Sequence, residues 1–203
     1  KQVLTDDRGK VLAYFFYRNL GDHLAVEETG VAEIGLCGSV LRASGRIAEE
    51  ESLAHLRIYS PPGHPMSRYL LEFRSRHETL ISCNAGGMLA FVDLEETFEH
   101  MIPEWERCLR DSGAHDLRTE ATLFVDGAPQ RIRANRGAID IARSPGKSKV
   151  SLSAAEMMHL LTGYRYAEDV LAAKQCFLSP DARALLRAVF PKRAPFVWPY
   201  DRF

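Results

Sequence analysis

The order in which strand-like and helix-like patterns follow one another constrains the fold of this chain most. Single strands alternate with helices in the first part of the sequence, and this alternation stops once, near the middle. Residues 10–18 (KVLAYFFYR) and 23–27 (HLAVE) are rich in apolar and aromatic side chains, as strands are. Apolar residues at helical spacing follow over 31–47, and a strand-like alternation follows over 55–59. Strands that alternate with helices favour an α/β or α+β layer, which we expect for the first part of the chain.

This first part continues up to a junction near residues 86–93. Helical spacing over residues 65–76 predicts a further helix, and residues 78–83 and 88–92 predict strands. Beyond the junction the alternation of single strands and helices stops. We therefore place a domain boundary there.

A capping-box pattern, Asp93-Leu-Glu-Glu96, opens the second part. The Asp93 carboxylate is able to accept from free amides of the first turn, and Glu96 is placed to reach back. The helix that it opens is expected to run to about residue 111, although Pro103 within it predicts a kink or a break. Its apolar face comprises Leu94, Phe98, Ile102, Trp105 and Leu109.

Short strand-like segments separated by turns follow this helix. They cover residues 120–125, 130–134, 138–141 and 149–152, and they predict an antiparallel meander. A second capping box, Ser153 to Glu156, opens a short helix, and two more helices are expected over 167–173 and 181–190. The prediction is an α+β fold with one domain over residues 1–88 and a second, with a small antiparallel sheet and helices, over residues 89–203.

Charge, hydropathy and cysteine spacing exclude several function classes. The formal charge of -1 and the pI of about 6.7 indicate that the chain has no net positive electrostatic field that would attract nucleic acid or an anionic membrane. The longest apolar run, residues 11–17, is far shorter than the roughly 20 residues that span a bilayer, and no signal peptide is found, so we expect a cytoplasmic protein without membrane partners. The four cysteines form no CxxC pair, so no metal site is expected.

Three groups of polar residues are candidate sites. His55 and His64 flank a Pro-Pro-Gly turn, Glu27 and Glu28 are adjacent carboxylates, and several arginines are close in sequence: Arg131, Arg133, Arg136 and Arg143. Ordinary surface or packing roles are favoured for the histidines. Alternation along a strand points the two glutamates in opposite directions. Cross-strand acids such as Asp140 and Glu120 are placed to neutralise the arginines.

The chain ends on FPKRAPFVWPYDRF, residues 190–203, which contains five aromatic residues and three prolines. Terminal residues usually fray. Aromatic side chains bury much apolar area when they dock, and prolines reduce the entropy that docking removes. We therefore expect this segment, called the tail below, to be ordered.

The tail, the turn LLTGY at residues 160–164 and the segment GMLAFVD at residues 87–93 resemble the carboxyl-terminal part of GNAT acetyltransferases of the enhanced intracellular survival (Eis) type. That family has a second, degenerate GNAT domain followed by a sterol-carrier-protein-like domain. The resemblance implies that residues 1–88 are a partial GNAT-like α/β layer and residues 89–203 the sterol-carrier-like domain.

The resemblance also implies the chemistry. In the family the terminal carboxylate is a general base, a role that would fall to Phe203, and Trp198 and Tyr200 would contact the amine substrate. Acetyl-CoA would bind to an N-terminal GNAT domain outside this sequence, because residues 33–38 lack the basic or amide residue and the glycine spacing of the family's pyrophosphate loop. This chain would then hold no cofactor, be inactive alone, and have as partners that domain and further copies in a homo-oligomer.

Two alternatives belong to other function classes. The sterol-carrier-like domain is able to serve as a non-enzymatic module that holds an apolar ligand between sheet and helices. A free sheet edge left by half a GNAT layer is able to pair with another chain, which would make the role structural.

Overall fold

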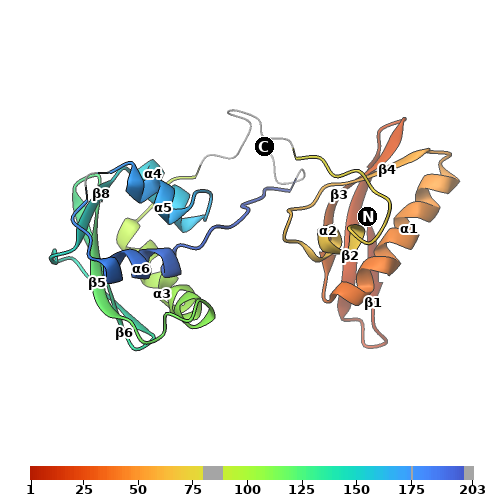
Figure 1. The fold of residues 1–203 in the computed structure, drawn as a ribbon. Helices are drawn as coiled ribbons and strands as arrows, with labels where there is room; N and C mark the ends of the chain where they lie inside the picture. Colours follow the sequence, from red (N-terminus) through yellow and green to blue (C-terminus); the bar gives the residue numbers. More distant parts are fainter. Residues whose placement is uncertain (80–88, 175, 199–203) are drawn as a thin grey trace. The chain divides into compact units, whose positions relative to one another are not determined.

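The computed structural model describes residues 1–79, 89–174 and 176–198. The chain divides into two compact units. Unit 1 is Lys1–Gly87 together with the tail from Phe196 onward, and unit 2 is Met88–Pro195. Each unit contains one four-stranded sheet with helices packed on it, which confirms the α+β class (Figure 1).

Unit 1 is built on a sheet with the strand order β1-β2-β3-β4. Its elements are β1 (Gln2–Thr5), β2 (Val11–Asn19), β3 (His23–Val31), the 3-10 turn η1 (Ile34–Leu36), α1 (Cys37–Glu50), β4 (His55–Ile58) and α2 (Pro65–Leu70). Neighbouring strands are antiparallel except β3 and β4, which are parallel and joined by α1. The predicted helices over 31–47 and 65–76 are present, the first shifted toward its carboxyl end and the second shorter.

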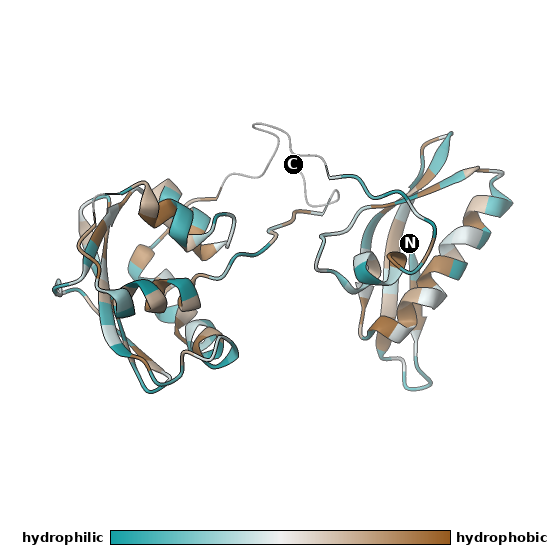
Figure 2. Ribbon diagram, in the orientation of Figure 1, coloured by the Kyte–Doolittle hydropathy of each residue, from teal (hydrophilic) through white to brown (hydrophobic). Residues whose placement is uncertain are grey.

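One face of this sheet carries the core of unit 1. Alternation along β2 places Ala13 and Phe15 on the face that α1 covers, where they pack with Val26, Val40 and other apolar residues. Figure 2 shows apolar residues on the strands of both sheets and on the helices that cover them. The two-residue period of β2 therefore decides which of its side chains are buried.

Unit 2 has the strand order β7-β6-β5-β8, with its helices on one face of the sheet (Figure 1). Its elements are α3 (Leu94–Asp111), β5 (Arg118–Val125), β6 (Ala128–Asn135), β7 (Ala138–Ala142), β8 (Lys149–Leu152), α4 (Ala154–Leu161), α5 (Ala167–Ala172) and α6 (Pro180–Val189). Strands β5, β6 and β7 form the expected antiparallel meander. Strand β8 differs from the prediction, because it pairs with β5 and runs parallel to it.

The reversed position of β8 follows from the connection before it. Residues 143–148 cross the outer face of β5, where the Gly146 amide donates to Thr122 Oγ1 at 2.8 Å. A Cβ at Gly146 would lie 2.1 Å from Glu120 Oε1, so a larger residue here would displace the Glu120 side chain. This passage carries the chain to the far side of β5.

Both predicted helix starts are confirmed. Asp93 accepts from the Glu96 amide at 2.9 Å, and Ser153 and Glu156 form a complete capping box. Helix α3 runs through Pro103 without a break. Pro103 lies on the exposed side of α3, where water is able to satisfy the carbonyl that loses its partner.

Two other predictions differ from the structure or lie beyond it. Residues 89–92 form no strand, and Val92 is fully exposed. The strand expected over 78–83 falls mostly outside the described residues. Within the described ranges, no helix has both the length and the apolar character that crossing a membrane requires.

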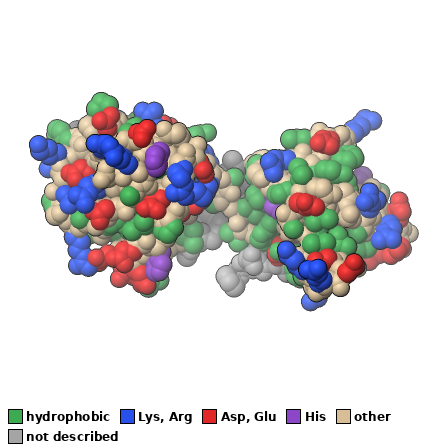
Figure 3. All heavy atoms as spheres, turned by 90° about the horizontal axis from the view of Figure 1, so that it is seen from below, with side chains coloured by type: hydrophobic (Ala, Val, Ile, Leu, Met, Phe, Trp, Pro, Cys, Tyr) green, Lys and Arg blue, Asp and Glu red, His purple; other side chains and the backbone are tan. Residues whose placement is uncertain are grey.

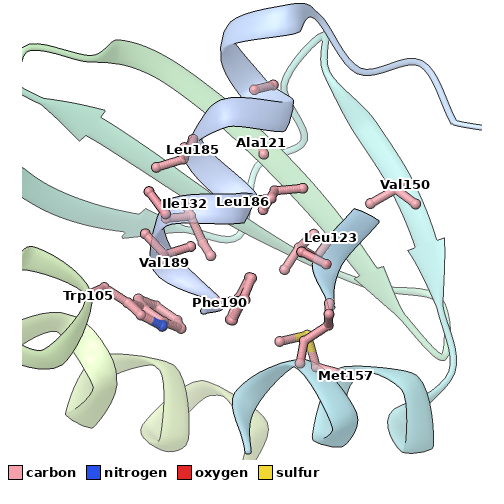
Figure 4. Packing of buried hydrophobic residues seen from close by; sticks show 14 of the residues in the cluster. Trp105, Ala121, Leu123, Ile132, Val150, Met157, Leu185, Leu186, Val189 and Phe190 are labelled. Atoms are coloured by element: carbon pink, nitrogen blue, oxygen red, sulfur yellow. The ribbon is translucent and has the colours of Figure 1, made fainter. Parts of the chain in front are cut away.

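Aromatic contacts hold the core of unit 2 together. Trp105 meets Phe98 and Phe190 edge to face, at ring-centroid distances of 5.2 and 5.6 Å. Figure 4 shows Leu186 and Val189 of α6 close to the sheet residue Ile132, with Trp105 and Phe190 packed in the same cluster. Phe190, the first residue of the tail, is therefore part of this core.

Candidate functional site

The candidate site lies in unit 1 where β4 ends beside the second half of the parallel strand β3. Their register pairs Val26 with Ile58, the last residue of β4, so the residues that follow β4 lie beside the end of β3, which continues to Val31. Helix α1 begins near this edge after β3, and α2 begins near it after β4. Ligands of open sheets with parallel strands bind at the carboxyl ends of those strands.

His64 occupies the start of α2 at this edge. Its Nδ1 atom accepts from the Met66 amide at 3.1 Å and so caps the helix. Burial lowers the pKa of His64, and a hydrogen bond to the Thr29 backbone acts in the opposite direction. The imidazole is therefore neutral at pH 7, with its Nδ1 lone pair directed at the helix.

Thr29, near the end of β3, is a buried polar residue beside His64. Its side chain is 1% exposed, and Oγ1 has no hydrogen-bond partner among the described residues. Such a hydroxyl is costly to leave unpaired. The Thr29 hydroxyl is therefore a buried polar group that is free to bind a ligand atom at this edge of the sheet.

The tail also contacts His64. The rings of Trp198 and His64 meet edge to face, with centroids 5.7 Å apart and planes at 89°. Phe196 in turn meets Trp198 edge to face, with ring centroids 5.1 Å apart. The expected docking of the tail is observed at Phe190, which is buried, and at Trp198, whereas residues 192–197 are exposed. Tyr200 and Phe203 lie outside the described residues.

Other polar side chains surround the edge. The hydroxyls of Ser60 and Ser67 are 2.5 Å apart, and Ser67 donates to the Pro61 carbonyl at 2.9 Å, which fastens the Pro-Pro-Gly turn to α2. A Cβ at Gly38 would lie 2.9 Å from the Tyr69 hydroxyl, so α2 packs closely against the first turn of α1. Burial raises the pKa of the Cys37 thiol, which keeps it protonated and unreactive.

The structure separates His55 from His64. His55 pairs with His23 at the beginning of the parallel pair, whereas His64 lies beside Thr29 at the other end. The two histidines therefore do not form one site. Among the described residues no group of three or more His, Cys, Asp or Glu is placed to hold a metal ion.

The two adjacent glutamates also do not form a pair. Glu27 is ion-paired with Arg18, and Glu28 accepts from the Tyr14 hydroxyl at 2.8 Å. Each carboxylate thus has its own partner. This agrees with side chains that point in opposite directions along β3.

Arg131, Arg133 and Arg143 of unit 2 each have an acidic partner. Arg131 lies 3.5 Å from Glu120, Arg133 lies 2.6 Å from Asp140, and Arg143 pairs with Glu95. A surface hollow of about 550 Å³ lies over this part of the sheet and is lined by both signs of charge. Figure 3 likewise shows basic and acidic side chains interleaved on the visible face of unit 2. An anion site here is not supported.

Sequence reasoning considered His64 only together with His55 and did not connect it with Trp198 or Thr29. The pattern His-Pro at the start of a helical segment was the available signal, because a capping residue before proline is a common helix start. The contacts with Thr29 and Trp198 join residues far apart in the chain. Nothing local in the sequence encodes them.

Comparison with known proteins gives little. No family model and no curated protein matches the chain. One similar solved structure is the crystal structure of sterol carrier protein 2, at 12% sequence identity and a TM-score of 0.33, over 46% of this chain and 96% of that chain. A likeness this weak carries no argument about function, and the resemblance to Eis-type acetyltransferases rests on the sequence motifs alone.

Proposed function

We propose that the chain is the carboxyl-terminal portion of a GNAT-family N-acetyltransferase, which transfers an acetyl group from acetyl-CoA to an amine. The observation that carries the proposal is the contact of the tail with unit 1, where Trp198 lies against His64, the residue before α2. A tail that ended in solvent would need neither this contact nor the anchoring of Phe190 in the core of unit 2.

In this proposal the Phe203 carboxylate is the general base. The amine nitrogen attacks the thioester carbonyl, the carbon–sulfur bond breaks, the CoA thiolate leaves, and the carboxylate takes the proton from the nitrogen. A carboxylate suits this role because it also attracts an ammonium group, provided that it is held within hydrogen-bond reach. Trp198 and Tyr200 would form walls of the acceptor pocket.

Acetyl-CoA would bind to a domain outside this sequence. In unit 1 the segment before α1 begins with Glu33, whose side chain makes no capping hydrogen bond. A carboxylate at this position repels a pyrophosphate, which helix N-termini otherwise attract. Unit 1 would therefore contribute pocket walls and contacts in a homo-oligomer, and a cytoplasmic location remains a prediction from the sequence.

The alternative function, an apolar-ligand carrier, has less support. The space between the sheet and helices of unit 2 is occupied by close-packed side chains such as Trp105, Phe98 and Met157, each fully buried. A groove of about 750 Å³ lies elsewhere, between β1, β2 and α1 of unit 1, with Arg42, Arg46 and Glu49 at its rim. A carrier function would require the core of unit 2 to open.

The decisive test compares this chain with a longer version that includes the preceding coding sequence. Release of CoA from acetyl-CoA in the presence of an amine is expected only for the longer protein, and deletion of Phe203 should abolish it. Calorimetric titration of the chain alone with acetyl-CoA should show no binding. Tight binding to the chain alone would overturn the proposal, and a lipid that co-purifies with it in native mass spectrometry would favour the carrier.

A further inference from the structure

The sheet of unit 1 extends beyond the helix that covers it. Helix α1 packs on β2, β3 and β4, and β1 is the strand at the edge of the described sheet. The groove of about 750 Å³ mentioned above lies between α1 and the strands β1 and β2. Sites for small organic ligands have volumes of about 300–1,000 Å³, so this groove is large enough to hold one.

The floor of the groove is apolar. Leu4 of β1 is paired with Ala13 of β2, so both side chains lie on the face of the sheet that α1 covers. Phe15, two residues further along β2, lies on the same face, and Ala43 of α1 lines the opposite wall. Ala13 and Phe15 are buried, whereas Leu4 is 40% exposed. The chain therefore leaves part of this apolar floor uncovered.

Two arginines of α1 lie at the rim of the groove. Arg42 and Arg46 are one helical turn apart, and both side chains are exposed. Arg42 donates to the neutral Ser39 hydroxyl at 3.4 Å. Within the described part of the chain, neither arginine forms an ion pair with a carboxylate. Both guanidinium groups are therefore available to an anion that enters the groove.

Glu49 limits the charge of that anion. It lines the same groove three residues after Arg46. The ionised side chains of the lining are two guanidinium groups, of Arg42 and Arg46, and this one carboxylate, which leaves a net charge of +1. A ligand with a single negative charge matches this lining. A doubly charged phosphate ester would in addition be repelled by Glu49.

We propose that the groove is a binding site for a straight-chain carboxylate of the fatty-acid type. The carboxylate would accept hydrogen bonds from Arg42 and Arg46, because guanidinium groups match carboxylates in charge and shape. The hydrocarbon chain would lie on Leu4 and Phe15, beside a stretch of α1 from residue 39 to residue 49 that is about 15 Å long. The site lies within unit 1 and does not depend on the proposed acetyltransferase function.

Calorimetric titration of this chain with dodecanoate, kept below the concentration at which micelles form, tests the site. Dodecanoate should bind, and dodecylammonium, which has the same chain with a positive head group, should bind at least about tenfold more weakly. Butyrate should show no measurable binding, because its chain is too short to cover the floor. Equal affinities for dodecanoate and dodecylammonium would overturn the proposal, since the arginines would then not select the ligand.

Substitutions at exposed positions assign the binding to this groove. The double variant Arg42→Gln, Arg46→Gln should weaken dodecanoate binding at least about tenfold. Glu49→Gln should strengthen it by about twofold to fivefold, because the net charge of the lining rises. The matched control is the double variant Arg110→Gln, Arg136→Gln, which removes the same charge from exposed positions of unit 2 and should leave the affinity unchanged.

Three further results would contradict the proposal. A wild-type chain that does not bind dodecanoate would overturn it. Wild-type affinity in the Arg42→Gln, Arg46→Gln variant would place the ligand elsewhere, for example in the core of unit 2. A dimer in sedimentation velocity that this double variant dissociates would show that a second copy of the chain fills the groove instead.

Discussion

Trp198 stands edge-on to His64, with ring centroids 5.7 Å apart and planes at 89°, although 134 positions separate the two residues in the sequence. His64 also caps α2 through Nδ1. One imidazole thus joins a helix start, the end of β3 and the tail. A substitution of His64 is able to remove the ring contact with Trp198 while keeping the helix cap.

We expect His64→Asn to release the tail without damage to α2. Asparagine is a good capping residue, so the helix start is retained while the ring that faces Trp198 is lost. His64→Ala should release the tail and also destabilise unit 1 by about 1 kcal/mol, because the cap is lost as well. The Trp198 contribution to fluorescence, taken as the difference from the matching Trp198→Phe protein, should shift to longer wavelength in both variants. An unchanged spectrum in His64→Asn would contradict the contact.

Acidification should weaken unit 1 through His64. Burial lowers the folded-state pKa of His64 below the value of about 6.5 for a free imidazole, so the unfolded chain takes up the proton first. Stability is complete above pH 6.5 and is lost progressively as the pH falls below that value. Thermal unfolding from pH 7.5 to 5 should show a smaller loss for His64→Asn than for the wild type. Parallel curves for the two proteins would refute this assignment.

Phe190→Ala should destabilise unit 2 by about 3–5 kcal/mol, because it leaves a cavity beside Trp105 in a closely packed core. Phe177→Ala, at a side chain that is 77% exposed, should change the stability by no more than about 0.5 kcal/mol. Urea unfolding followed by circular dichroism measures both. A small effect at Phe190 would mean that the tail does not begin inside the core.

Glu104→Gln should lower stability in a manner that depends on pH. The pKa of Glu104 falls from 4.5 to about 2 in the folded state, chiefly through Arg107 and then Arg193. The difference between wild type and variant should be complete above pH 4.5 and disappear as the pH falls toward 2. Part of the carboxylate is exposed, so high salt should reduce the difference. Melting temperatures at low and high salt provide the check, and a difference that persists unchanged at pH 2 would argue against the ion pairs.

Local features of the fold were predictable because they depend on neighbouring residues. The capping boxes at Asp93 and Ser153 satisfy amides within one turn, and they mark helix starts whatever else surrounds them. The division into an alternating first part and a short-stranded second part follows from apolar periodicity in the same way. The strand expected over residues 88–92 was wrong for residues 89–92, because an apolar run reads as a strand only where a neighbouring strand pairs with it.

The candidate site was less predictable. A docked tail was expected from its aromatics and prolines, and the structure shows docking at Phe190 and Trp198 but not at the exposed Phe196. The roles of Phe203, Trp198 and Tyr200 stay predictions that come from the resemblance. The contacts of Thr29 with His64 and of Arg193 with Gly163 were not expected, because each joins segments that are distant in sequence.

The sequence by itself determined the α+β class and the helix starts at Asp93 and Ser153, since these depend on spacing and hydrogen bonding within a few residues. Only the tertiary structure decided that β8 lies beside β5, that His64 meets Trp198, and that Arg193 lies over Gly163 between α4 and α3. The reason is physical: such pairings are selected by packing and by the satisfaction of buried polar groups across the whole chain. No short segment contains that information.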